Sequence, residues 1–63
     1  MNLSETNILE IDGKLFKFHT VKRTKKEAQT TANNIRKTKN RYVRVIQDRQ
    51  TRWWDVFVGP KKL

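Results

Sequence analysis

Hydrophobic and polar residues alternate most clearly in two segments near the end of the chain. The segments are Arg41–Gln47, with the sequence RYVRVIQ, and residues 53–58, with the sequence WWDVFV. β-Branched and aromatic residues fill both segments, which is typical of strands. The polar residues DRQT separate them and form a loop of ordinary hairpin length. We therefore predict an antiparallel hairpin whose second strand ends at Gly59 and Pro60.

The two faces of this predicted hairpin differ in chemistry, because side chains at i and i+2 share one face of a strand. One face is almost pure hydrocarbon, and we expect it to face the core: Val43, Val45, Trp54, Val56 and Val58. The other face, called the mixed face below, carries rings, aliphatic groups and charges: Tyr42, Arg44, Ile46, Trp53, Asp55 and Phe57. Such a face is either a binding platform or a second, thinner core, and the sequence leaves both interpretations open.

A second hairpin is predicted earlier in the chain, where Ile8–Ile11 and residues 14–21 flank the dipeptide Asp12-Gly13. Asp-Gly suits a type I′ turn, because both central residues need positive φ. A two-residue turn pairs Ile11 with Lys14 and places one apolar set on a face that we expect to be core: Leu9, Ile11, Phe16 and Phe18. The opposite face then extends the mixed face: Leu15, Lys17, His19 and Val21.

A helix is predicted between the two hairpins. Thr24-Lys-Lys-Glu27 fits a capping box, in which the threonine hydroxyl and the glutamate carboxylate each bind a backbone N–H group. The helix is expected to run to about Lys37. Its apolar stripe is thin and consists of Ala28, Ala32 and Ile35. Alanines allow a close approach to the sheet, where we expect large side chains to fill the space: Phe16, Phe18 and Trp54.

The order of these elements predicts a single small α+β domain, β-β-α-β-β, with an antiparallel or mixed sheet and one helix packed on one face. The domain is expected to span residues 8–60, between a flexible N-terminus (residues 1–7) and a basic tail (residues 61–63). A chain of 63 residues buries only about 60% of its unfolded surface, so a homodimer is a possible source of extra stability. The mixed face is expected to stay uncovered.

Charge is the strongest compositional feature of the chain. Fifteen Lys and Arg face six Asp and Glu, which gives a net charge of +9. A compact body with this charge attracts polyanions, and nucleic acid is the commonest of them. An anionic membrane surface or an acidic protein supplies the same opposite charge. The chain has no cysteine, no apolar run near the roughly 20 residues of a membrane helix and no secretory pattern, so we expect a cytoplasmic location without a membrane partner.

Catalysis is not expected. His19 is the only histidine, and the chain has no cysteine and no glycine-rich loop. A general base needs a group that orients it, and Asp55, across the predicted sheet, is the one candidate for that role. One histidine with scattered carboxylates also makes no metal-ligand set. We predict a protein that is not an enzyme and that has no cofactor or metal.

The mixed face supports a different function, because single-stranded nucleic acid is bound on open sheets by rings that stack on bases and cations that contact phosphates. The predicted sheet-face residues are Lys17, His19, Tyr42, Arg44, Trp53 and Phe57. The predicted phosphate contacts are Lys22, Arg23, Lys25 and Lys26 at the helix start, with Arg49 and Arg52 in the last loop. The chain is therefore predicted to bind DNA or RNA with little sequence specificity.

An alternative prediction is a protein-interaction module or homodimer. In that case the mixed face is an interface and the charge meets an acidic partner. The response to salt separates the two hypotheses, since nucleic-acid binding weakens steeply as salt rises.

The chain also resembles SPOR domains. The resemblance lies in the strand from Phe16 to Val21, the alanine-containing helix, and the closing motif Val56-Phe57-Val58-Gly59-Pro60, which matches the V-x-V-G-P end of those domains. It implies a related α+β fold over the larger part of the chain. SPOR domains bind glycan strands of peptidoglycan, have a second helix and usually follow a membrane anchor, and this sequence has neither of those segments. The functional prediction therefore depends on the residues above and not on this resemblance.

Overall fold

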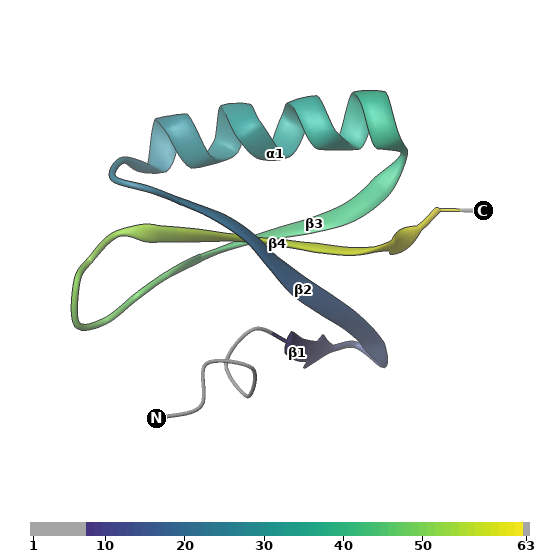
Figure 1. The fold of residues 1–63 in the computed structure, drawn as a ribbon, viewed down its shortest axis with the longest axis horizontal. Helices are drawn as coiled ribbons and strands as arrows, with labels where there is room; N and C mark the ends of the chain where they lie inside the picture. Colours follow the sequence, from purple (N-terminus) through teal and green to yellow (C-terminus); the bar gives the residue numbers. More distant parts are fainter. Residues whose placement is uncertain (1–7, 63) are drawn as a thin grey trace.

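The computed structural model describes residues 8–62 and contains one helix packed on a four-stranded sheet (Figure 1). The elements are β1 (Ile8–Ile11), β2 (Lys14–Lys22), α1 (Lys25–Lys39), β3 (Arg41–Gln47) and β4 (Trp54–Lys61). The strands lie in the order β1-β2-β4-β3, and every neighbouring pair is antiparallel. The predicted α+β domain with the order β-β-α-β-β is thus confirmed, with a sheet that is antiparallel throughout.

The predicted turn at Asp12-Gly13 forms, and the predicted capping box at Thr24 forms in part. Asp12 and Gly13 have φ of 53° and 76°, and the turn pairs Ile11 with Lys14, as a two-residue turn requires. The amide of Glu27 donates to Thr24 Oγ1 at 3.2 Å. The Glu27 carboxylate accepts from the Thr24 hydroxyl instead of from a backbone N–H group, so only half of the capping box forms.

The C-terminal end of α1 lies two residues beyond the predicted end. The helix continues to Lys39, and Asn40 then adopts the left-handed conformation with φ 52° and ψ 49°. Asparagine tolerates this region better than most residues, and a left-handed residue commonly follows the last helical turn. The stop signal is therefore Asn40, and Thr38 and Lys39 belong to the helix.

The core under the helix consists of small and β-branched side chains. Ala28 and Ala32 are fully buried and pack against Val43 and Val56. Three partly buried residues complete the layer: Ile35, Val45 and Trp54. The hydrocarbon face predicted for the last hairpin is confirmed as core, because these β3 and β4 residues contact α1.

Phe16 and Phe18 do not lie under the helix, and that prediction is wrong. Directly paired residues of antiparallel strands share a face. Phe18 pairs with Phe57 on the mixed face, and after an irregularity in β2 the next pair is Thr20 with Val56 on the helix side. The physical reason is the register of β2 on β4, which sets Phe18 opposite Phe57, whereas Trp54 does pack in the layer under α1 as predicted.

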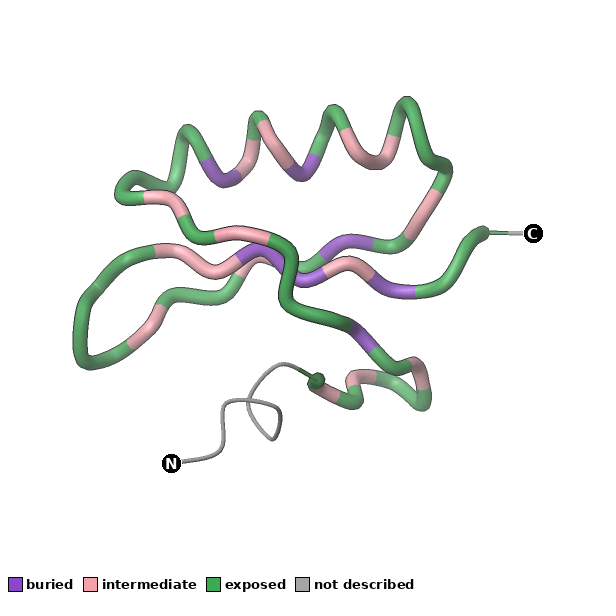
Figure 2. The backbone as a smooth tube through the Cα atoms, viewed as in Figure 1, coloured by how far each residue is buried: buried purple, intermediate pink, exposed green. Residues whose placement is uncertain are grey.

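The two rings contribute instead to a second core on the mixed face. Phe16 is 2% exposed and Phe57 is 4% exposed, and the ring of Phe18 meets that of Phe57 edge to face with centroids 5.8 Å apart. The β1–β2 hairpin forms one edge of the sheet, and its turn lies far from α1 (Figures 1 and 2). Its tip reaches β3, since Asp12 Oδ2 lies 3.1 Å from Arg44 Nη2. The mixed face is therefore partly covered, contrary to the prediction, and the covered part is a thinner core.

The last strand does not end at Gly59 and Pro60, as predicted, but continues to Lys61. The pairing of β3 with β4 shifts between Arg41–Lys61 and Val43–Val58, and proline is tolerated at such bulges. The amide of Lys62 then donates to the Asn40 carbonyl at 2.8 Å, which ties this end of the chain to the end of α1. The predictions for residues 1–7 and for Leu63 lie outside the described residues.

Candidate nucleic-acid interface

The positive charge of the protein is almost entirely without internal partners. All fifteen Lys and Arg lie between Lys14 and Lys62, and within residues 8–62 the only ion pair joins Arg44 to Asp12 at 3.1 Å. Both side chains of that pair are exposed, where an ion pair contributes little to stability. The other cations are therefore available to an anion from outside the chain.

The predicted sheet-face site is divided between two sides of the molecule. Lys17 pairs with Val58 and so lies on the helix side, and His19, two residues further along β2, lines the same hollow. Tyr42 and Arg44 lie on the mixed face, where Arg44 bonds to Asp12. The prediction that all four share one face is wrong, because the register shift in β2 exchanges the faces along that strand.

Two rings of the predicted platform are already engaged. Phe57 is buried and lacks the exposed ring face that a stacked base needs, so its predicted stacking role does not fit the structure. The Tyr42 ring is contacted by two ammonium groups, with Lys14 Nζ at 5.0 Å and Lys62 Nζ at 5.4 Å from its centroid. These cation–π contacts keep both charges beside Tyr42, which is 37% exposed.

Trp53 is the exposed ring that the structure holds in place. Its side chain is 41% exposed, and the guanidinium carbon of Arg23 lies 5.2 Å from its ring centroid. The Trp53 amide donates to Thr51 Oγ1 at 3.2 Å, and its carbonyl accepts from the Asp48 amide at 2.8 Å. The backbone around this ring is therefore fixed by hydrogen bonds.

Asp48 orders the rest of the loop between β3 and β4. Its carboxylate accepts from the amides of Gln50 and Thr51 at 2.7 and 3.2 Å, and its carbonyl accepts from the amide of Arg52 at 2.8 Å. Arg52 takes a positive φ of 65° to close the loop. Arg49 and Arg52 thus project from a loop with a defined backbone.

The β2–α1 connection and the β3–β4 loop lie at the same end of the molecule (Figure 1), where Arg23 contacts Trp53. Lys22 pairs with Trp54 across the sheet, and Lys25 Nζ lies 5.7 Å from the Trp54 ring centroid. We call this surface the tryptophan end, and it comprises Arg23, Lys25, Arg49, Arg52, Trp53 and Trp54. The two basic clusters predicted from separate parts of the sequence are brought together here by the pairing of β2 with β4.

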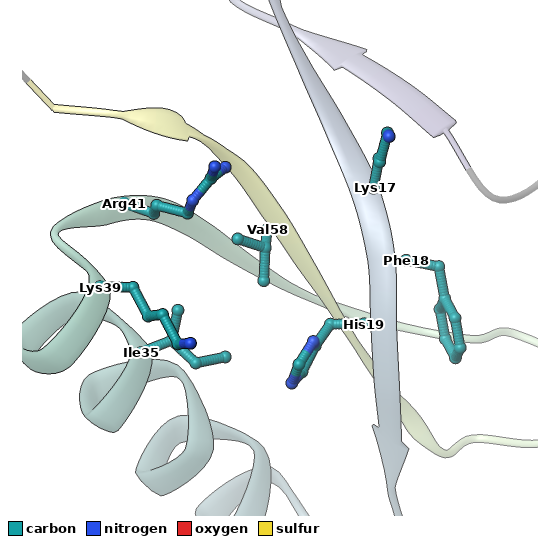
Figure 3. Close-up of a pocket in the computed structure, with 7 residues that line it drawn as sticks. All are labelled: Lys17, Phe18, His19, Ile35, Lys39, Arg41 and Val58. Carbon is teal, nitrogen blue, oxygen red and sulfur yellow. The ribbon is translucent and has the colours of Figure 1, made fainter.

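A hollow of about 340 Å³ lies between the C-terminal half of α1 and β2. It is lined by Lys17, Phe18, His19, Ile35, Lys39, Arg41 and Val58 (Figure 3). The side chains of His19 and Lys39 extend into the space between strand and helix, whereas Phe18 points away from it. No carboxylate lines this hollow among the described residues. Sequence reasoning missed Lys39 and Arg41 as site residues, although both belong to the basic run at the helix exit.

A second hollow of about 300 Å³ lies beside the N-terminal half of α1 and is lined by Lys22, Lys26, Glu27, Thr30 and Thr31. Glu27 is its one carboxylate, and that group accepts a hydrogen bond from Thr24. The predicted phosphate contacts Lys22 and Lys26 therefore line a hollow next to the tryptophan end.

The possible pairing of His19 with Asp55 does not form. Asp55 pairs with Val21 and Ile46 on the mixed face, whereas His19 lines the hollow on the helix side. Burial raises the pKa of the Asp55 carboxyl above its usual 3.8, and the nearby charge of Asp48 raises it further. Because the two residues lie on opposite sides of the sheet, Asp55 does not orient His19.

Comparison with family models, with curated proteins and with solved structures finds no match to this chain. The resemblance to SPOR domains stays a prediction. Among the described residues, no helix combines the length and apolar character needed to cross a membrane.

Proposed function

We propose that this protein binds nucleic acid, DNA or RNA, through cations that contact phosphates and an exposed tryptophan on which a base stacks. The proposal rests on positive charge that has no carboxylate partners, because residues 8–62 contain fifteen Lys and Arg but one ion pair. A protein that used this charge for its own stability would pair it with carboxylates. The proposal includes a cytoplasmic location and no catalytic activity.

The tryptophan end supplies both kinds of contact. Trp53 offers an exposed ring, and stacking of a base on such a ring is worth about 1–3 kcal/mol. Four cations of the same surface are the expected phosphate contacts: Arg23, Lys25, Arg49 and Arg52. Because contacts to phosphate carry no sequence information, we expect similar affinity for different sequences.

The test compares Trp53→Ala with the wild-type chain for binding to a fluorescently labelled single-stranded oligonucleotide at low salt. Loss of stacking is expected to weaken binding between about five- and 150-fold, which is the stacking energy expressed as affinity. Leu15→Ala is the matched control, because Leu15 is also an exposed apolar side chain but lies on β2 outside both hollows and the tryptophan end. Equal affinity of Trp53→Ala and wild type would exclude stacking at this ring. Absence of any binding at low salt would exclude the function.

A second candidate function is self-association through the mixed face. Phe18, Val21 and Ile46 remain exposed there, and Val21 and Ile46 flank Asp55 in one row across the sheet. Burial of this row in a homodimer would remove apolar surface from water but would also bury the charge of Asp55, which is costly. Light scattering at rising protein concentration tests it, since a dimer doubles the mass whereas a nucleic-acid-binding monomer does not.

A further inference from the structure

The two hollows lie along one seam between α1 and β2. Lys22 and Glu27 line the hollow near the start of α1, and His19 and Lys39 line the hollow near its end. Because residues of β2 line both hollows, both lie where α1 borders β2, and the hollow near the start of α1 adjoins the tryptophan end through Lys22, which pairs with Trp54.

We infer that this seam binds the backbone of single-stranded nucleic acid, with one nucleotide seated in the hollow at His19. The inference rests on the proposed function and deepens it, because it gives the path of the strand and selects single over double strand. The strand would run from the tryptophan end, past Lys22 and Lys26, to the hollow lined by His19 and Lys39.

The chemistry of the hollow at His19 fits a nucleotide. Lys17, Lys39 and Arg41 surround it with fixed positive charge, and no carboxylate competes for them among the described residues. Arg41 is held in place by a 2.9 Å hydrogen bond from its Nη1 to the Gly59 carbonyl. A guanidinium has five N–H donors, so Arg41 keeps others for a phosphate oxygen.

The floor of the same hollow is apolar. Ile35 and Val58 are only partly buried there, so a hydrocarbon surface lies directly beside the cations. A simple anion such as free phosphate gains nothing from that surface, whereas a base or sugar covers it. This combination favours a nucleotide over an inorganic ion.

The volume of the hollow at His19 and the length of the seam favour a single strand. A hollow of about 340 Å³ bounded by α1 on one side and β2 on the other admits one nucleotide unit. A duplex keeps its bases paired inside and cannot place a base there. The fifteen residues of α1 extend about 22 Å at 1.5 Å each, so a strand that contacts both ends of the seam must be several nucleotides long.

The chain provides a separate reporter at each end of the seam. His19 is the only histidine and lines the far hollow, whereas Trp53 lies at the tryptophan end. The experiment is an NMR titration of the full chain with oligothymidylates of about 4 to 16 nucleotides, the range of known single-strand sites. Long oligonucleotides are expected to shift both the His19 imidazole and the Trp53 indole signals, and affinity is expected to rise until the strand spans the seam.

Two charge-reversal variants, Lys39→Glu and Lys37→Glu, test whether the hollow at His19 contributes to binding. Lys39→Glu is expected to weaken binding of the long oligonucleotide about tenfold, as expected for the loss of a charged hydrogen bond, and to leave the Trp53 shift with the shortest one unchanged. Lys37→Glu is the matched control, because it makes the same charge change on an exposed residue of the same helix that does not line the hollow. Both substitutions lie at exposed positions, so the amide spectrum of each variant is expected to match that of the wild type.

The outcomes separate the inference from the proposed function. Shifts at Trp53 without any at His19 would overturn the seam and leave nucleic-acid binding in place. Equal losses in Lys39→Glu and Lys37→Glu would overturn it as well, because long-range charge alone would then explain the effect. A duplex of equal length that shifts His19 as strongly would overturn the selection of single strands. No shift at either reporter would remove the proposed function itself.

Discussion

At the scale of single residues, Asp55 is a carboxylate in unfavourable surroundings. It lies between Val21 and Ile46 on the mixed face and beside the charge of Asp48. Partial removal from water disfavours its ionised form, and the neighbouring negative charge acts in the same direction. Its pKa is therefore higher in the folded chain than the usual 3.8, so the folded state binds this proton more readily than the unfolded state.

Asp55→Asn is therefore expected to raise the free energy of unfolding at pH 7. Because the folded state holds the extra proton, ionisation of Asp55 costs stability as pH rises through its raised pKa. The cost is fully present at neutral pH and disappears as pH falls to the unfolded value near 3.8. Urea unfolding followed by tryptophan fluorescence at pH 7 and near pH 3.8 measures the difference, which should shrink at the lower pH. Glu10→Gln is the charge-matched control on β1, and a less stable Asp55→Asn at pH 7 would contradict this account.

At the scale of elements, the approach of β4 to β2 depends on the absence of a side chain at Gly59. A Cβ atom there would lie 2.7 Å from Cε2 and 2.9 Å from Cδ2 of the Phe16 ring. Phe16 is buried, so its ring has little room to move. Gly59 is required here for space, and its backbone does not adopt positive φ.

Gly59→Ala is therefore expected to destabilise the fold by about 1–3 kcal/mol, the usual cost of overpacking. Urea unfolding of Gly59→Ala, Phe16→Leu and the double variant measures it. The smaller side chain in Phe16→Leu should relieve the contact, so the alanine should cost less in the double variant than in the wild type. If the alanine costs the same in both backgrounds, the Phe16 contact is not the cause.

The same elements show which parts of the fold follow from local sequence. The Asp12-Gly13 turn, the Thr24 cap and the alternation in β3 are short-range signals, and each is realised in the structure. The pairing of β2 with β4 joins residues far apart in the chain, and its shift between Phe18 and Thr20 leaves no local signature. A one-residue change of register exchanges faces, so Lys17 and His19 could not be placed correctly.

The candidate site divides in the same way. Arg23, Lys25 and Trp53 could be named from local clusters of basic and aromatic residues, but only the tertiary fold brings them to one surface. The hollow at His19 draws its lining from β2, α1, β3 and β4 together. A site assembled from four elements has no spacing signal in the sequence, which is why Lys39 and Arg41 were not predicted as site residues.

At the scale of the whole molecule, the sheet is covered on both faces by thin layers. Alanines of α1 close one face and the rings around Phe16 and Phe57 close part of the other. A short chain thereby obtains two small cores, and its net charge of +9 opposes both through self-repulsion. The charge is thus a cost to folding, and binding of an anion would offset it.

Salt should therefore act in opposite directions on binding and on folding. Binding to single strands loses affinity with a slope of about −0.7 per phosphate contact in a plot of log K against log salt concentration. Four contacts at the tryptophan end predict a slope of about −3. A strand that fills the whole seam adds five cations, Lys17, Lys22, Lys26, Lys39 and Arg41, and is expected to steepen the slope to about −6.

The same salt is expected to raise the melting temperature of the free chain, since it screens repulsion among cations that have no carboxylate partners within residues 8–62. Fluorescence titrations and thermal unfolding on the same samples measure both responses, and the rise in stability shows that lost binding at high salt is not unfolding. An affinity that does not change with salt, or a dimer whose stability does not change with salt, would instead favour a protein partner on the exposed apolar residues of the mixed face. If affinity falls and melting temperature rises with salt in the same samples, the unpaired cations that destabilise the free chain are also the ones that bind nucleic acid.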